Sequence, residues 1–255
     1  MPAKENDSQN VWFGVSMFLL GIIAGAVLTA ATGNIQLGKG DRGATASSAP
    51  TAPTAPSAPT PDVNDRMVAY AEAIGIDKSD FQNCMNNDAA ALQAKINQET
   101  TEGQASGVNG TPGNILYDLR SKKARLVSGA QPVANFEKNI DAMLADANAK
   151  VTDQSAQEVS TVVPVDFDKD HVIGSRDAKI AIIEYTDYQC PFCHAVHTTH
   201  QQLLKKYDGK VVWVMRHFPL SFHPEAMPLA TGAECAAKLK GNDAFWAFTD
   251  KVMSE

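Results

Sequence analysis

The chain has 255 residues and a formal net charge of −7 at pH 7; it has few basic clusters, which gives no support for nucleic-acid binding. Its length allows one or two folded domains. The first sixty residues do not have the composition of a globule, so we expect the folded part to begin near Asp62.

The first part of the chain predicts a membrane anchor. Residues 11–31 are almost continuously apolar and carry no charge, and about twenty such residues span a bilayer as a helix. We predict a short tail over residues 1–10 and a transmembrane helix over residues 11–31. A cleaved signal peptide is the alternative, because Thr29, Ala30 and Ala31 are small enough for processing.

A linker is predicted over residues 32–61, where Ala, Pro, Thr and Ser dominate. Such a segment cannot bury a core and favours extended, polyproline-like conformations. We expect it to be disordered and to hold the folded part away from the membrane.

Two segments with strand and helix patterns follow, over residues 62–150 and 162–255. The first segment predicts helices at 63–74 and 78–85, a longer helix that ends near 106, strands at 114–117 and 124–127, and a last helix that bears Phe136 and Ile140. After a polar linker at 151–161, the second predicts strands 162–167 and 179–185, a helix to 206, a strand at 211–215, and helices 225–238 and 244–253. Neither segment alone offers a complete sheet with both faces covered.

The motif Cys190-Pro191-Phe192-Cys193 lies where the apolar strand at 179–185 runs into a helix. Two thiols at this spacing can close and reopen a disulfide, and helix N-terminal amides stabilise a thiolate at the first position. We predict that Cys190 attacks and Cys193 resolves the mixed disulfide, while Pro191 fits the first helical turn. A CxxC motif beside a βα pattern is typical of thioredoxin-like redox proteins.

Three other interpretations of the motif remain open. Half of a zinc site is disfavoured, since zinc needs four ligands and the histidines at 194, 197 and 200 fit the exposed side of a helix better. Together with His194 the motif also matches the C-x-x-C-H pattern of c-type haem attachment, which would indicate an electron-transfer protein. A non-catalytic, thioredoxin-like binding module is the third. We predict no metal and no cofactor.

Several motifs together resemble DsbA-like thiol:disulfide oxidoreductases. Residues 184–193 resemble the family's active-site entry, residues 216–220 the end of its next strand, and residues 107–113 and 128–132 its cis-proline loop and final hairpin. The halves stand in the opposite order here. The resemblance implies an α/β, thioredoxin-like fold with a helical insertion, circularly permuted, in which residues 62–150 form the C-terminal-type half and residues 162–255 the N-terminal-type half. A swapped dimer and a fragment of a tandem protein are the alternatives.

The resemblance also assigns site residues. Glu184 is implied to be a buried acid that moves protons to and from the second cysteine. Thr111 and Pro112 are implied to form a cis-proline loop that packs against the dithiol and presents backbone groups to an extended substrate. Without the resemblance, this stretch is an ordinary turn.

The remaining cysteines, Cys84 and Cys235, lie one in each segment. The family sometimes carries a second bridge between the corresponding helices, so we predict a structural disulfide; two separate buried thiols are the alternative. Strong oxidants of the family often have a histidine where this chain has Phe192. Phenylalanine cannot make the polar contacts by which that histidine stabilises the reduced thiolate, so Phe192 complicates the direction of catalysis; oxidase remains preferred, with reductase or isomerase open.

The function implied by the resemblance is that of a membrane-anchored, extracytoplasmic thiol:disulfide oxidoreductase. Its substrates would be unfolded or partly folded exported proteins, and a quinone-linked membrane partner would reoxidise the dithiol. The charges that flank residues 11–31 are few and lean slightly against this orientation. The predicted location, a single-pass protein with its catalytic domain in the periplasm or at the cell surface, rests on the chemistry, because disulfides need an oxidising compartment.

Overall fold

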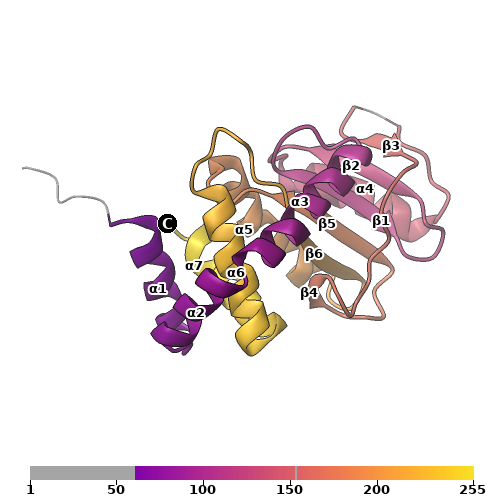
Figure 1. Ribbon diagram of the computed structural model, residues 1–255. Coiled ribbons are helices and arrows are strands. Elements are labelled where there is room, and N and C mark those ends of the chain that lie inside the picture. Colours follow the sequence, from indigo (N-terminus) through magenta and orange to yellow (C-terminus); the bar gives the residue numbers. More distant parts are fainter. Residues whose placement is uncertain (1–60, 153) are drawn as a thin grey trace, which may run out of the picture. The chain divides into compact units, whose positions relative to one another are not determined.

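The computed structural model describes residues 61–152 and 154–255 (Figure 1). The expected tail, the expected anchor and nearly all of the expected linker lie outside the described residues. Among the residues that are described, no helix has both the length and the apolar character needed to cross a membrane.

Seven helices and six strands occur in the described part of the chain. The helices are α1 (Val63–Ala73), α2 (Lys78–Asn87), α3 (Ala89–Ala105), α4 (Val133–Ala145), α5 (Pro191–Lys206), α6 (Ala226–Lys240) and α7 (Asn242–Met253). The strands are β1 (Gly113–Asp118), β2 (Ala124–Ser128), β3 (Gln157–Val159), β4 (His171–Gly174), β5 (Ile180–Thr186) and β6 (Val211–His217).

Side-chain caps start the first two helices. The Asp62 carboxylate accepts the Asn64 N–H at 2.8 Å, and the Asp77 carboxylate accepts the Ser79 N–H at 2.7 Å. Each bond satisfies a donor that has no partner within its helix. Gly75 lies between the two helices with a φ of 77°, a conformation that favours glycine.

All six strands form one sheet, in the order β3-β2-β1-β5-β6-β4. β5 and β6 are parallel and the other neighbours are antiparallel. β5 is buried along its whole length, as expected of a central strand rich in isoleucine. β1 comes from the first segment and β5 from the second, and they pair from Gly113–Tyr185 to Asp118–Ile180. The two segments therefore build a single sheet.

Both faces of the sheet are covered. On one face, alternate residues of β1, β5 and β6 pack against α4 and α5 and share a core with the remaining helices. On the other face, the intervening residues pack with Val108, Phe218 and the segment 159–172. The molecule is thus a mixed α/β protein, as the sequence predicted, and the arrangement is consistent with a thioredoxin-like fold.

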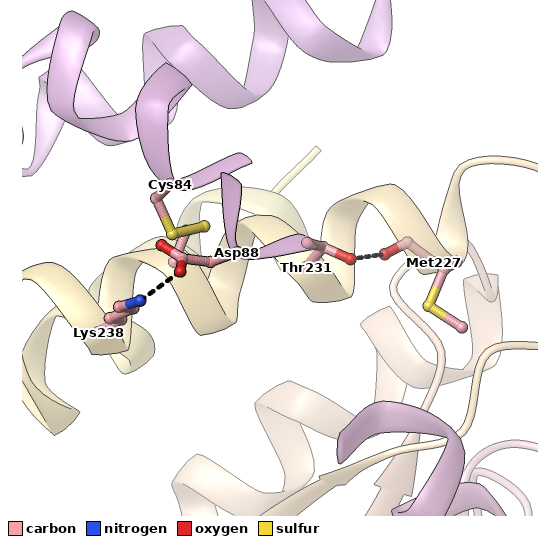
Figure 2. The surroundings of a disulfide bond; sticks show 6 residues. Cys84, Asp88, Met227, Thr231 and Lys238 are labelled. Carbon is pink, nitrogen blue, oxygen red and sulfur yellow. Dashed lines mark hydrogen bonds and ion pairs between the residues drawn. A yellow bond between two sulfur atoms is a disulfide. The ribbon is translucent and has the colours of Figure 1, made fainter. Parts of the chain in front are cut away.

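A group of helices, α1, α2, α6 and α7, lies at one side of the sheet, and α3 runs from this group towards the sheet (Figure 1). Figure 2 shows a disulfide between Cys84 of α2 and Cys235 of α6, beside an ion pair in which Lys238 Nζ lies 2.6 Å from Asp88 Oδ1. The bridge joins residues 151 positions apart, and hence the two segments.

The prediction of a strand at 162–167 is wrong. The strands nearest to these residues in the sequence are β3, which lies within the segment expected as a linker, and β4. Pro164 has no N–H to give to a ladder. The carbonyls of Val163 and Pro164 instead accept hydrogen bonds from the buried Arg216 guanidinium, at 2.9 and 3.0 Å.

Candidate active site

The turn between β5 and α5 carries the CxxC motif, residues 190–193. Asp187 shapes this turn: its carbonyl accepts the Cys190 N–H at 3.0 Å and its carboxylate accepts the Gln189 N–H at 2.7 Å. Cys190 is the N-cap of α5 and Pro191 is its first residue. The first cysteine therefore lies at a helix end where backbone N–H groups have no intrahelical partner.

The two thiols of the motif are free, and they differ in their acidity. Cys190 is 4% exposed and Cys193 is 0% exposed. Hydrogen bonding to the Cys193 thiol is the largest cause that lowers the pKa of Cys190, to about 5; the Thr111 side chain and the N–H groups of Cys193 and Phe192 add to this against the effect of burial. Burial, then the bond to Cys190 and the charge of Glu184, raise the pKa of Cys193. At neutral pH the first sulfur is a thiolate and the second a thiol.

The loop before β1 packs against this dithiol. The peptide bond between Thr111 and Pro112 is cis, and the Thr111 carbonyl lies 3.5 Å from Cys190 Sγ. The sheet register explains the contact: because β1 and β5 are antiparallel and Gly113 pairs with Tyr185, the residues that precede β1 lie beside those that follow β5. The loop and the motif are thus brought together by one strand pair.

Glu184 lies on β5 and is 0% exposed. Its Oε2 accepts hydrogen bonds from Trp213 Nε1 at 3.0 Å and from His200 Nδ1 at 3.1 Å, whereas Oε1 has no partner among the residues that the structure describes. The donors come from β6 and α5, the two elements that cover this part of the strand. An oxygen without a partner in a buried carboxylate is open to accept a proton.

A second loop, residues 218–225, is fastened to the same turn. The Asp187 carboxylate accepts the Leu220 N–H at 2.7 Å and contacts His223 Nδ1 at 2.8 Å, and the Asp187 N–H points to Cys193 Sγ at 3.5 Å. Two large apolar side chains are exposed here, Phe192 in the motif at 66% and Phe222 in this loop at 71%. Both are available to apolar groups of another molecule.

The histidines of α5 are engaged inside the protein. His194 Nε2 lies 2.8 Å from the Tyr188 carbonyl, so the nitrogen that would bind a haem iron is already occupied and these residues do not fit that alternative. His197 Nε2 lies 2.7 Å from Asp250 Oδ1. In the family's strong oxidants, a histidine at the position of Phe192 makes a polar contact with the thiolate. In the described part of this chain, no histidine contacts the Cys190 sulfur in its place.

The prediction that the three histidines form the exposed side of α5 is wrong for two of them. His197 and His200 are 5% and 0% exposed. They follow Cys193 by four and seven positions, the spacing of residues on one helix face. In the described part of the chain, no group of three or more His, Cys, Asp or Glu side chains is arranged to hold a metal ion.

Sequence reasoning missed His200, Trp213, Asp187 and Phe222 as parts of this site. His200 carried a signal, because its spacing from Cys193 places it on the inner face of the helix. The contact of Trp213 with Glu184 depends on the parallel pairing of β5 and β6. The contact of Asp187 with the 218–225 loop depends on how that loop folds back onto the turn. Neither of these two contacts can be recognised from a local sequence pattern.

Comparison with known families places this site in context. The DSBA-like thioredoxin domain matches residues 58–141, and a family described as Thioredoxin matches residues 166–255. Each match covers about a third of the chain. The resemblance to DsbA-like thioredoxin domains is thereby confirmed, and it supports a thiol:disulfide oxidoreductase in general.

Curated proteins that resemble part of this chain include much longer Na(+)/H(+) antiporters. The chain is 39% identical to Na(+)/H(+) antiporter NhaA 3 of Salinispora tropica over 97 residues, which are 38% of this chain and 14% of that protein. It is 37% identical to Na(+)/H(+) antiporter NhaA 1 of Mycolicibacterium gilvum over 92 residues, 36% of this chain and 14% of that one. The chain thus spans about a seventh of the length of these relatives.

Proposed function

We propose that this protein is a thiol:disulfide oxidoreductase that forms or exchanges disulfides in unfolded or partly folded exported proteins through Cys190 and Cys193. One observation carries the proposal. A thiolate with a pKa lowered to about 5 lies at a helix N-terminus, against a cis X-Pro loop and beside a thiol whose pKa is raised. Dithiol catalysis requires one sulfur that attacks and leaves easily as a thiolate, here Cys190. It also requires a second sulfur that gives up and takes back a proton, here Cys193.

In the disulfide-donating direction, a substrate thiolate attacks Cys190 Sγ. The Cys190–Cys193 bond breaks, and Cys193 leaves as a thiolate that takes up a proton. A second substrate thiolate then attacks the substrate sulfur of the mixed disulfide, and Cys190 leaves as a thiolate. The substrate loses two electrons and the enzyme gains them. The low pKa of Cys190 makes it a good leaving group in the last step.

An extended substrate segment would lie along the Thr111–Pro112 loop. The backbone of this loop is positioned beside the attacking sulfur, and a peptide can add to exposed backbone groups with little sequence preference. Phe192 and Phe222 would contact apolar side chains that unfolded proteins expose. This arrangement suits substrates that are not yet folded.

We further propose that the domain is a circular permutant of the DsbA-like arrangement. Pairing of β1 with β5 and the Cys84–Cys235 disulfide both join residues 62–150 to residues 162–255 within one chain. Arg66 of α1 also forms an ion pair at 2.7 Å with Glu255, which follows α7, and this is a further contact between the two segments.

Membrane attachment and an extracytoplasmic location complete the proposal. Residues 11–31 would anchor the chain and residues 32–61 would act as a stalk. The disulfide between Cys84 and Cys235 supports an oxidising compartment. If the protein donates disulfides, a quinone-linked membrane protein would reoxidise the dithiol.

A redox titration of the full chain tests this proposal. The protein is equilibrated with glutathione buffers, its free thiols are alkylated, and the state of each cysteine is read by mass spectrometry; Cys190→Ser and Cys193→Ser variants serve as controls. We expect reversible exchange at Cys190 and Cys193 while Cys84 and Cys235 stay bonded. A midpoint of about −120 mV would indicate a disulfide donor and one of about −270 mV a reductant. The proposal fails if the two sulfurs never exchange.

A further inference from the structure

Glu184 and His200 form a buried pair behind the dithiol. Both side chains are 0% exposed, and His200 Nδ1 lies 3.1 Å from Glu184 Oε2. The other polar atom of each group, Glu184 Oε1 and His200 Nε2, has no hydrogen-bond partner within residues 61–152 and 154–255. Buried polar atoms without partners are rare and call for a functional explanation.

The pair lies in the same layer as the second cysteine. Cys193 and His200 are seven positions apart on α5, so they lie on one face of that helix. Successive residues of β5 point to opposite faces of the sheet, so Glu184 lies on the same face as Ile182. Ile182 belongs to the core cluster that contains Cys193. Burial is the largest cause that raises the pKa of Cys193, and the charge of Glu184 acts in the same direction.

The hydrogen bonds to Glu184 meet at one oxygen. Trp213 Nε1 can only donate, and a carboxylate can only accept, so an imidazole in contact with the Glu184 carboxylate donates from Nδ1. Both contacts are made to Oε2, and no described residue donates a hydrogen bond to Oε1. The rings of Phe136 and Trp213 stand edge-on to the imidazole, with centroids 5.4 and 5.0 Å away, and fix its orientation.

Other titratable groups around the pair have partners of their own. His197, on the same helix, is paired with Asp250 of α7, and His217 at the end of β6 is paired with Glu234 of α6. The residues of α4 that face this core are apolar, and Asn114 of β1, which pairs with Glu184, is neutral. Tyr188, whose hydroxyl lies 2.7 Å from Thr249 Oγ1, is a further titratable group in this core. Cys193 is the group in this set whose proton the exchange reaction must move.

We propose that His200 is a positioning residue for proton transfer at Cys193. Its Nδ1–H, with Trp213 Nε1–H, holds Glu184 Oε2, so that Oε1 alone is free to exchange a proton with the Cys193 sulfur. This inference rests on the proposed function and adds a residue to it.

The proton balance of the step is simple. When Cys193 attacks the mixed disulfide at Cys190, the S–H proton passes to Glu184 Oε1, the Cys190–Cys193 bond forms and the substrate leaves as a thiolate. In the opposite direction, Cys193 leaves as a thiolate and takes the proton back from Oε1. His200 keeps its own proton throughout.

The test follows the resolution of a mixed disulfide in the full-chain protein. Reduced protein is mixed with oxidised glutathione, and the release of the first and second glutathione thiols is measured by rapid quench between pH 5 and pH 9. The first release reports attack by Cys190 and the second reports attack by Cys193. Three variants are compared with the wild type. His200→Leu removes the hydrogen-bond donor to Glu184 Oε2, and His200→Asn keeps a donor at this position. His197→Leu, on the same helix face, is the control.

We expect His200→Leu to slow the second release about ten-fold at pH 7 and to move its pH profile upward by about one unit. A buried carboxylate that has lost a donor ionises at higher pH, so fewer molecules at pH 7 carry the ionised carboxylate that can take the proton from Cys193. His200→Asn should restore most of the rate, and the first release should be unchanged in both. His197→Leu should leave the profile of the second release in place.

Three results would overturn the inference while leaving the proposed function intact. These are a His200→Leu profile that matches the wild type, an equal shift in His197→Leu, and no rescue by His200→Asn. If no mixed disulfide forms at Cys190 in the wild type, the proposed function fails and the inference falls with it. Should His200→Leu not fold, Trp213→Phe removes the other donor to Oε2 and must shift the profile in the same direction.

Discussion

Cys190 and Cys193 are one helical turn apart, yet their surroundings act on them in opposite directions. Cys190 lies at the end of α5, where N–H groups and the Cys193 thiol stabilise its thiolate. Cys193 lies inside the core, where burial and the charge of Glu184 disfavour a second negative charge. The difference arises from position on the helix, since both side chains are chemically identical.

The Cys190 thiolate should respond to its neighbours in a definite order. Cys193→Ala removes the largest stabilising contact and Thr111→Val a smaller one. We expect both variants to raise the pKa of Cys190 above about 5, Cys193→Ala by more. Thiolate absorbance or the pH dependence of Cys190 alkylation measures this, with Cys84 and Cys235 left oxidised. A larger effect from Thr111→Val would contradict this order.

The same thiolate should make the stability of the reduced protein depend on pH. The pKa of Cys190 is lowered on folding from an unfolded value of 9.0 to about 5, so between these values the unfolded chain binds more protons. The stabilisation is therefore complete above pH 9 and is lost as the pH falls towards 5. The pKa of Cys193 is raised, so its effect lies above pH 9.

Urea unfolding of the reduced protein and of reduced Cys190→Ala measures this contribution. We expect the difference in their free energies of unfolding to grow with pH between 5 and 9, by at most about 1.4 kcal/mol per pH unit. A difference that stays constant over this interval would show that Cys190 has an ordinary pKa.

At the scale of elements, the site depends on how α3 packs on the sheet. Gly103 of α3 faces β5: a Cβ there would lie 2.7 Å from Tyr185 Cδ1 and 3.0 Å from Phe218 Cδ2. Both aromatic side chains are buried, and Tyr185 directly precedes Thr186 at the end of the strand that leads to the motif. The missing side chain permits close approach of a helix to the strand that carries the dithiol.

Gly103→Ala should therefore destabilise the protein although alanine is the better helix former. We expect a loss of about 1–2 kcal/mol, since overpacking outweighs a helix-propensity gain of about 1 kcal/mol. Thermal or denaturant unfolding measures it. Gly110→Ala is the control, because nothing lies within 4 Å of its added Cβ; equal stability of the two variants would rule out the close-packing argument.

For the whole molecule, the important feature is that two segments far apart in the sequence form one sheet and one helical group. The sheet joins them through β1 and β5, and the Cys84–Cys235 bridge joins them through α2 and α6 (Figure 2). The active site needs both, because the CxxC motif and the cis X-Pro loop come from different segments. Any change that separates the two segments should therefore abolish the site.

Loss of the bridge should strongly destabilise the fold. A closed loop of about 150 residues restrains the unfolded chain by about 5 kcal/mol on the chain-entropy model. We expect the double variant Cys84→Ser, Cys235→Ser to unfold at a much lower denaturant concentration while keeping a low pKa at Cys190. Denaturing electrophoresis without reductant should show that the oxidised wild type has no disulfide between chains; a disulfide-linked dimer would favour the swapped arrangement instead.

Local sequence patterns were sufficient for much of this architecture. The apolar run at 179–185 predicts a buried strand, and the helical spacing of Phe136 and Ile140 predicts an amphipathic helix, because period and burial are coupled within a few residues. The CxxC motif predicts a helix-terminal dithiol for the same reason. Pro164 within the expected strand at 162–167 is also a local signal, because proline has no N–H to give to a ladder and argues against a strand there.

Other features depend on contacts between distant residues and so leave no local signal. Pairing of β1 with β5 sets Thr111 beside Cys190, and pairing of β5 with β6 sets Trp213 beside Glu184. The burial of His200 becomes significant only when the carboxylate that it contacts is known. Residue chemistry and helix position are properties of a short stretch of chain, whereas the partners of a buried polar atom depend on the packing of the whole sheet.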